Sequence, residues 1–265
     1  MDYAKQTKIM KKMRPYILAE TNWKTLQNAS FDLAILPWGA TEAHNYHLPY
    51  GTDNFQVDAI AAESAKQAWE KGAKVIVLPT IPFGVNTGQT DIYLDLNIYP
   101  STQYAILNDT IEVLNRHGIK KLLILNGHGG NDFKSMVREL GVKYPDVFIC
   151  VSSWFHTLDR DKIFDQPGDH ADEVETSLVL HLTPELVLPK EDWGNGKEKK
   201  NKISAFNKGW VWAERKWSEI SEDTGTGNPK LATKEKGEKC FKDVTAKIGE
   251  MLYDLSKVDR SDLYI

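Results

Sequence analysis

The sequence has few cysteines and no long apolar stretch. Its 265 residues include two cysteines, Cys150 and Cys240, which are too few for a disulfide framework in a chain of this size. No run approaches the roughly 18 apolar residues of a membrane span. The lysine-rich segment 1–16 lacks the apolar centre of a signal peptide. We therefore expect a cytoplasmic protein with no membrane partner.

An excess of charge of either sign is also missing. The chain carries 33 basic and 37 acidic side chains, for a net charge of −4. Its most basic stretch, residues 197–202, is short, whereas useful binding to nucleic acid needs many phosphate contacts. We interpret it as a solvated loop and expect no nucleic-acid partner. With 41% hydrophobic and 26% charged residues, the composition is typical of globular proteins, and we predict a single domain over residues 1–265.

Apolar runs alternate with helical patterns along most of the chain. Continuous runs at residues 33–37, 74–78, 121–125 and 147–151 predict buried parallel strands. Helical spacing is found at residues 54–71, 101–118, 131–141, 172–182 and 234–255. This alternation predicts a three-layer α/β/α sandwich with a largely parallel central sheet.

Residues 189–229 differ from the rest, because they are rich in Gly, Lys, Asn and Trp and lack long periodicity. A loop of this length inside a compact domain is usually functional or disordered. Its tryptophans favour ordering against the active site or a neighbouring subunit, and a peripheral excursion with its own small cluster is an equal alternative.

Polar side chains follow the predicted strands at the edge where an open α/β sheet binds ligands. Glu42, His44 and Asp53 follow the first strand, and His128 follows the third. In an extended segment, Glu42 and His44 point to the same side, so a carboxylate and an imidazole converge. Mixed ligands of this kind suit Zn²⁺, Mn²⁺ or Fe²⁺. Taken singly, each has an ordinary alternative: Asp53 as a helix cap, for example, or His128 as a polar turn residue.

Glycines surround His128 in the segment 126–131. Gly127, Gly129 and Gly130 permit a sharp turn from strand to helix. The helix that follows would favour an anion, but no Lys-Ser/Thr pair follows the glycines, as a phosphate-binding loop requires. A metal-binding histidine on a glycine turn fits the pattern better.

A third polar group lies at or just before the helix predicted near residue 172. His170 and Glu173 stand at i and i+3 and share a helical face if the helix has begun at His170. Glu175 would then point elsewhere, so we predict Glu173 as the ligand. An ordinary acidic first helical turn, favoured by the helix dipole, is the alternative.

Together these segments resemble the creatininase (creatinine amidohydrolase) family. The family's three motifs correspond to residues 36–53, 126–131 and 170–177, with Asp172 in place of a glycine in the last. The resemblance implies an α/β sandwich, a dinuclear metal centre and commonly a hexamer, so we expect a homo-oligomer with two divalent ions (Zn, Mn or Fe). Where creatininase itself has a glutamate ligand, this chain has Gly130.

The resemblance also implies roles for individual residues. Carried over by position, Glu42 and His128 hold one metal, His44 and Glu173 hold the other, and Asp53 bridges the two.

The activity implied is that of a metal-dependent amidohydrolase, in which a metal-bridging hydroxide attacks the carbon of a C–N bond in a cyclic or linear small-molecule amide and the bond to nitrogen is cleaved. His170 passes a proton to the leaving nitrogen, or alternatively orients Glu173. His47, Gln89 and Trp154 are candidates for the substrate pocket. Alternatives are a formamidopyrimidine-type deformylase or a precursor-peptide peptidase on the same site, or a non-catalytic metal- or ligand-binding protein.

Overall fold

Four parallel strands form the central sheet, in the order β2-β1-β3-β4, in this computed structural model, which describes residues 13–265. Residues 1–12 of the lysine-rich N-terminal segment lie outside the described part. The strands are β1 (Leu33–Trp38), β2 (Val75–Val77), β3 (Lys121–Asn126) and β4 (Phe148–Ser153). Ile35 in the middle of β1 pairs with Val77 on one side and Leu123 on the other. The predicted parallel sheet is confirmed, with each strand within about two residues of its apolar run.

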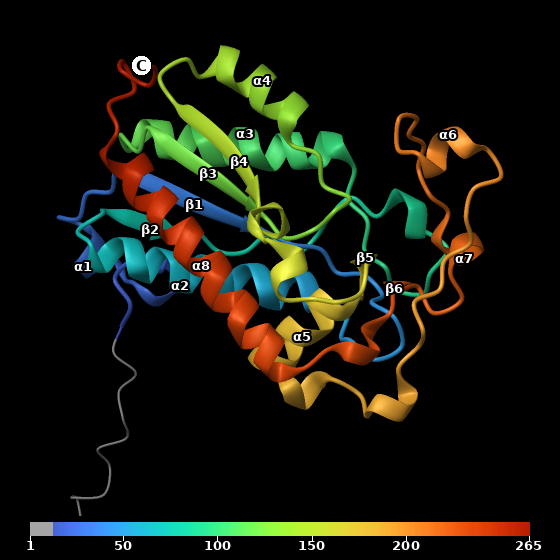
Figure 1. Cartoon of the computed structure of the whole chain (residues 1–265). Coiled ribbons are helices and arrows are strands. Elements are labelled where there is room, and N and C mark those ends of the chain that lie inside the picture. The colour runs from blue at the N-terminus through green and yellow to red at the C-terminus, as the bar shows by residue number, and fades with distance from the viewer. Residues whose placement is uncertain (1–12) are drawn as a thin grey trace, which may run out of the picture.

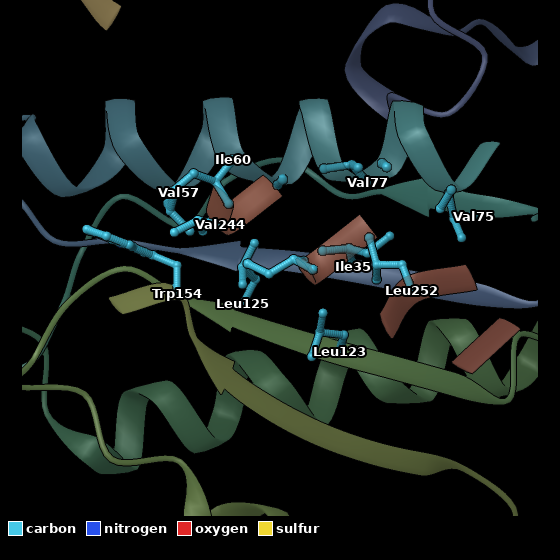
Figure 2. Close-up of a cluster of buried hydrophobic side chains, with 14 of the residues drawn as sticks. Ile35, Val57, Ile60, Val75, Val77, Leu123, Leu125, Trp154, Val244 and Leu252 are labelled. Atoms are coloured by element: carbon cyan, nitrogen blue, oxygen red, sulfur yellow. The ribbon is translucent and has the colours of Figure 1, made fainter. Parts of the chain in front are cut away.

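Helices cover both faces of this sheet, so the predicted three-layer sandwich is also confirmed (Figure 1). One face carries α2 (Thr52–Glu70), α5 (Glu173–Leu182) and α8 (Lys234–Lys257), and the other carries α3 (Pro100–Arg116) and α4 (Lys134–Lys143). Alternate strand residues serve the two layers. Ile35 packs with the first set of helices and Leu36 with the second, because successive side chains of a strand point to opposite faces. Figure 2 shows the core beneath α2 and α8.

The strand order places a switch point between β1 and β3. The chain leaves β1 through α2 to reach β2, then crosses through α3 to reach β3 on the other side of β1. Connections from these neighbouring strands therefore run in opposite directions and leave a crevice at their carboxyl ends. The segments that carry the candidate ligands begin at this crevice.

One helix begins later than predicted. The pattern indicated a start at Asn131, but α4 begins at Lys134. The side chain of Asn131 is used elsewhere, since its Oδ1 accepts hydrogen bonds from the Val85 N–H (3.1 Å) and the Gln103 side chain (2.8 Å). Asn131 thus fixes the turn after β3 to the loop after β2 instead of capping a helix.

Residues 189–229 lie beyond the carboxyl ends of the strands, where Figure 1 shows α6 (Ser204–Asn207), α7 (Trp217–Ile220) and β6 (Thr226–Gly227). β6 pairs antiparallel with β5 (Gly168–His170). The segment packs on loops of its own chain. For example, the Ser218 hydroxyl donates to Asp91 at 2.6 Å, and the Tyr46 hydroxyl donates to the Glu222 carbonyl at 3.1 Å. Within the described chain, residues 189–229 are therefore ordered by contacts with the loops at the mouth of the crevice.

Two short helical pieces, η2 (Leu18–Glu20) and α1 (Trp23–Leu26), precede the sheet. Of the helices in residues 13–265, none has the length and apolar character needed to cross a membrane.

Candidate metal centre

Six side chains from five segments converge at the crevice. Glu42 and His44 come from the extended segment after β1, and Asp53 from the first turn of α2. The other three are His128 after β3, His170 at the end of β5 and Glu175 in the first turn of α5. All are buried except Glu175, whose side chain is 15% exposed. Strand ends and helix starts thus bring residues far apart in the sequence to one place.

Asp53 lies at the centre of this cluster. Its Oδ1 is 3.1 Å from His44 Nε2, and its Oδ2 is 3.1 Å from His128 Nδ1. The ligand atoms of Glu42, Asp53 and His128 lie within 4.8 Å of one another, and so do those of His44, Asp53 and Glu175. Asp53 belongs to both groups and offers one oxygen to each, as a carboxylate that bridges two ions does.

The outer nitrogen of each imidazole is fixed by a backbone carbonyl. His44 Nδ1 donates to the Glu42 carbonyl (3.1 Å), and His128 Nε2 donates to the Val85 carbonyl (3.1 Å). His170 Nε2 donates to the Ala43 carbonyl at 2.8 Å. A carbonyl oxygen only accepts, so the proton sits on the outer nitrogen and the other nitrogen faces the carboxylates. This is how metal-ligating histidines are usually oriented.

Two buried carboxylate oxygens indicate whether the cluster could bind a metal. Glu42 Oε1 and Asp53 Oδ2 are buried and accept no hydrogen bond from the described residues, although they lie 2.7 and 3.1 Å from His128 Nδ1. Buried charged oxygens need a partner, and coordination to a metal supplies one. A divalent ion therefore fits the donors present.

Crowding of charge in this cluster shifts its pKa values. Burial lowers the pKa of His44, but the charge of Asp53 and the hydrogen bond to it outweigh burial and raise that pKa to about 10. Burial raises the pKa of Glu175 to about 8, although the charge of His44 opposes the shift. In the metal-free protein, protons thus occupy positions that a cation would take, as expected of a metal site.

Glu173, which we predicted as a ligand, is not in this cluster. Its buried Oε2 accepts hydrogen bonds from the backbone N–H groups of Asp165 (3.0 Å) and Gln166 (2.8 Å), and its Oε1 pairs with Lys236 of α8. It joins the loop before α5 to α8. The prediction failed because it assumed a helix that had already begun at His170.

The helix begins only at Glu173. Ala171 has a φ of 50°, which interrupts any helix there, and His170 belongs to β5. Asp172 is the N-cap and accepts hydrogen bonds from the N–H groups of Val174 and Glu175. Glu175 occupies the third helical position and folds back to accept from the Ala171 N–H at 2.6 Å. Asp172 followed three residues later by glutamate resembles a capping box, a sequence signal that could have identified Glu175.

His170 lies beside the carboxylates and not beside Glu173. Its Nδ1 is 3.8 Å from Glu42 Oε1, its ring centroid is 4.2 Å from that of His44, and Trp217 packs edge-on at 4.6 Å. The alternative that His170 orients Glu173 is therefore wrong.

Comparisons with known proteins identify the family of the chain. The profile of the Creatininase family, described as creatinine amidohydrolase, matches residues 19–252. The chain belongs to the creatininase family.

Among curated family members, a 3-dehydro-scyllo-inosose hydrolase of Thermotoga maritima is 28% identical over 186 residues, 64% of this chain but only 55% of that protein. A mycofactocin precursor peptide peptidase of Mycolicibacterium smegmatis is 25% identical over 79% of both chains.

Solved structures show the same fold. A Bacteroides fragilis NCTC 9343 protein, provisionally assigned as a creatinine amidohydrolase, has a TM-score of 0.89 and 39% identity, covering 96% of this chain and all of that one. A manganese creatininase has a TM-score of 0.77 at 20% identity, covering 92% of this chain and all of that one, and shares the fold alone.

The creatininase-family chain has a cavity of about 870 Å³ in front of the cluster, and Glu42, Asp53, His128, His170 and Glu175 line its inner end. Gln89 and Trp154, the candidates for the substrate pocket, both line this cavity, and Gln89 also donates a hydrogen bond to Glu42. Trp154 is at the same time a buried part of the core (Figure 2).

His47 does not line this cavity, contrary to the prediction. Its Nε2 hydrogen bonds the Thr176 hydroxyl at 2.9 Å, and its ring stacks on Trp193 with centroids 4.7 Å apart. His47 therefore links the start of α5, next to Glu175, to the segment at the crevice mouth.

Gly130 leaves no space for a side chain. A Cβ there would lie 2.4 Å from both His128 Nε2 and the Val85 carbonyl oxygen, the two atoms whose hydrogen bond orients the imidazole. In the conformation described, a glutamate at this position would displace His128.

Proposed function

We propose that this creatininase-family chain is a metal-dependent amidohydrolase with two divalent ions, which cleaves a C–N bond of a cyclic or linear amide. The observation that carries the proposal is the shared Asp53, whose two oxygens face His44 and His128 at 3.1 Å each. A structural site rarely needs such a bridging carboxylate and is usually closed to solvent, whereas this one opens onto a cavity.

The proposed ligands fall into two sets that share Asp53. Glu42, Asp53 and His128 would hold one ion, and His44, Asp53 and Glu175 the other. When bound, a pair of divalent ions supplies Lewis acidity and lowers the pKa of coordinated water. The solved structures with Zn and Mn in family members support such ions, and the native metal stays open among Zn, Mn and Fe.

His170 is the proposed proton carrier. Its Nε2 is held by the Ala43 carbonyl, so Nδ1 is the nitrogen available at the cavity. Burial lowers the pKa of His170, and the neighbouring His44 lowers it further, so a neutral imidazole is favoured that can take a proton from water and deliver it to the leaving nitrogen. Trp217, packed edge-on, fixes the plane of the ring.

Gln89 is a positioning residue in this proposal. It donates to one oxygen of Glu42, which leaves the other, Oε1, facing His128. A neutral amide at this place fixes the carboxylate without adding charge.

A second candidate is peptidase activity on the same site. A cavity of about 870 Å³ lies near the upper end of the range for small-molecule sites, and a relative is a precursor peptide peptidase. Both observations favour an amide larger than creatinine, so a peptide end and a substituted cyclic amide are both retained.

The test is hydrolysis by the protein loaded with Mn²⁺ or Zn²⁺, measured as ring opening of creatinine to creatine and as amine release from formamides, N-acyl amino acids and short peptides. We expect turnover of at least one class and a loss of about 10²-fold or more in kcat for His170→Asn, with metal content unchanged. Metal-loaded protein that hydrolyses none of them would contradict the proposal. A homo-oligomeric state, a cytoplasmic location and a single domain stay predictions.

A further inference from the structure

An arginine faces the same cavity as the metal cluster. Arg160, in the short helix η5 (Arg160–Lys162), lines the cavity together with His170 and Glu175. Its side chain is 30% exposed, so it is accessible from the cavity but partly desolvated. A guanidinium at such a site is either a structural partner or a recognition group.

The hydrogen bonds of Arg160 use only one end of its guanidinium. Nη2 donates to the Gln166 carbonyl at 2.8 Å and to Asp172 Oδ2 at 2.7 Å. Among the described residues no acceptor bonds to Nε or Nη1. Because a guanidinium carries five N–H donors in a planar fork, the Nε and Nη1 groups remain for a ligand.

Asp172 holds the arginine rigidly. While its Oδ2 accepts from Arg160, its Oδ1 caps α5 by accepting from the N–H groups of Val174 (2.8 Å) and Glu175 (3.1 Å). A guanidinium already held in place loses less conformational entropy when it binds a ligand.

Other charges around the cavity are engaged. Asp169 accepts from Arg215 at 3.0 Å, and Glu214 accepts from the Thr87 hydroxyl at 2.6 Å. Asp132 accepts from a backbone N–H at the start of α4. The Arg215 side chain is 43% exposed, so water screens its charge more than that of Arg160. Of the two arginines at the cavity, Arg160 is therefore the less exposed, and the neutral N–H of Trp154, buried and without a partner among the described residues, also lines the cavity.

We propose that Arg160 binds a carboxylate of the substrate and determines specificity, so that the molecule cleaved carries a carboxylate besides its amide, as an N-acyl amino acid or the C-terminal end of a peptide does. Because both hydrogens of Nη2 are used, the carboxylate would accept a single charge-assisted hydrogen bond, from Nη1 or from Nε. The inference deepens the proposed amidohydrolase function and rests on it for the reaction, but carboxylate binding itself requires no turnover.

The experiment compares hippurate with hippuramide, which differ only in the carboxylate, by isothermal titration calorimetry on the protein as purified. We expect the unchanged protein to bind hippurate at least about tenfold more tightly. Arg160→Gln should abolish this preference while changing hippuramide binding by less than about twofold. Arg160→Lys, which keeps the positive charge but cannot bond Asp172 and the ligand through one planar group, should retain only part of the preference. Arg116→Gln, a charge loss on the exposed face of α3, is the control and should retain all of it.

Equal binding of both compounds, a preference that survives in Arg160→Gln, or binding of neither compound would overturn the proposal. An equal loss of hippurate and hippuramide binding in Arg160→Gln would show a merely structural role and overturn it as well. Failure of the proposed function appears separately, as absence of metal or of hydrolysis, and leaves this binding comparison intact.

Discussion

The two sides of the first turn of α5 carry one glutamate each, and they belong to different parts of the molecule. Glu173 faces the loop before the helix and pairs with Lys236 of α8, whereas Glu175 faces the cluster of imidazoles and carboxylates. On the first side every carboxylate oxygen has a protein donor. On the second, Glu42 Oε1 and Asp53 Oδ2 accept no hydrogen bond from the described residues and instead face His128 Nδ1, a nitrogen that can also bind a metal. The comparison shows that the two glutamates differ in their surroundings: Glu173 is surrounded by protein donors, whereas Glu175 lies beside buried oxygens that remain open to a cation.

The largest loss of metal and activity should come from replacing Asp53, at the centre of the cluster that Glu175 faces. Asp53→Ala removes the carboxylate that both ligand sets share, so we expect loss of both metal ions and a fall in kcat/KM on the order of 10³-fold or more for whichever amide is cleaved. Asp58→Asn, on the same helix but bonded to the Thr80 hydroxyl at 2.7 Å, should leave both unchanged. Full metal retention in Asp53→Ala would break the comparison.

Replacing Glu173 should lower the stability of the fold and leave metal binding unchanged. Glu173→Ala leaves two backbone N–H groups without an acceptor and removes one of the two carboxylates paired with Lys236, and we expect a loss of about 3 kcal/mol in the free energy of unfolding by urea. Metal bound per folded chain should not change. The exposed Glu185 serves as control, since Glu185→Ala should cost less than about 0.5 kcal/mol. If Glu173→Ala were as stable as the unchanged protein, the structural role of Glu173 would be wrong.

His47, which contacts the same helix α5, should make the stability of the fold depend on pH. Burial lowers the pKa of His47 to about 4, below its value of about 6.5 in an unfolded chain. The fold favours the neutral form of His47. Its contribution to the free energy of unfolding is therefore fully present above pH 6.5, and about 2–3 kcal/mol of it is lost as the pH falls toward 4. Unfolding of the metal-free protein between pH 7 and 4 measures this.

In the matched variant His47→Gln, the acid-dependent part of the stability should shrink by that amount. A profile identical to that of the unchanged protein would mean that His47 is not held neutral between Thr176 and Trp193.

The smallest effect is a coupling energy. A double-mutant cycle between Glu173 and Lys236 should give about 1–2 kcal/mol, because the two side chains form an ion pair. The same cycle between Glu175 and Lys236 should give less than about 0.5 kcal/mol. Similar coupling for both glutamates would show that the two sides of the turn are not separate.

The sequence allowed the sheet to be predicted because its strands are buried on both faces, and their apolar runs are continuous. It also indicated Glu42, His44, Asp53 and His128, which follow strand ends and whose convergence depends only on the strand order. Glu173 and Glu175 could not be separated in the same way. Their directions depend on where α5 begins, and that is decided by the backbone of Ala171, at a φ of 50°, and by the Asp172 cap.

Contacts that span long sequence distances were also beyond prediction. Periodicity gives no information about the packing of residues 189–229, because their order comes from individual tertiary contacts such as Trp193 on His47 and Trp217 on His170. The orientation of Arg160 toward Asp172 likewise depends on an irregular loop.

The most direct test of the central claim, that Glu175 and not Glu173 completes a two-metal site, is elemental analysis of the unchanged protein, Glu175→Gln and Glu173→Gln, all purified without chelator. We predict about two equivalents of divalent metal per chain in the unchanged protein and in Glu173→Gln, and at least about one equivalent less in Glu175→Gln. Full metal content in Glu175→Gln together with loss in Glu173→Gln would contradict the account.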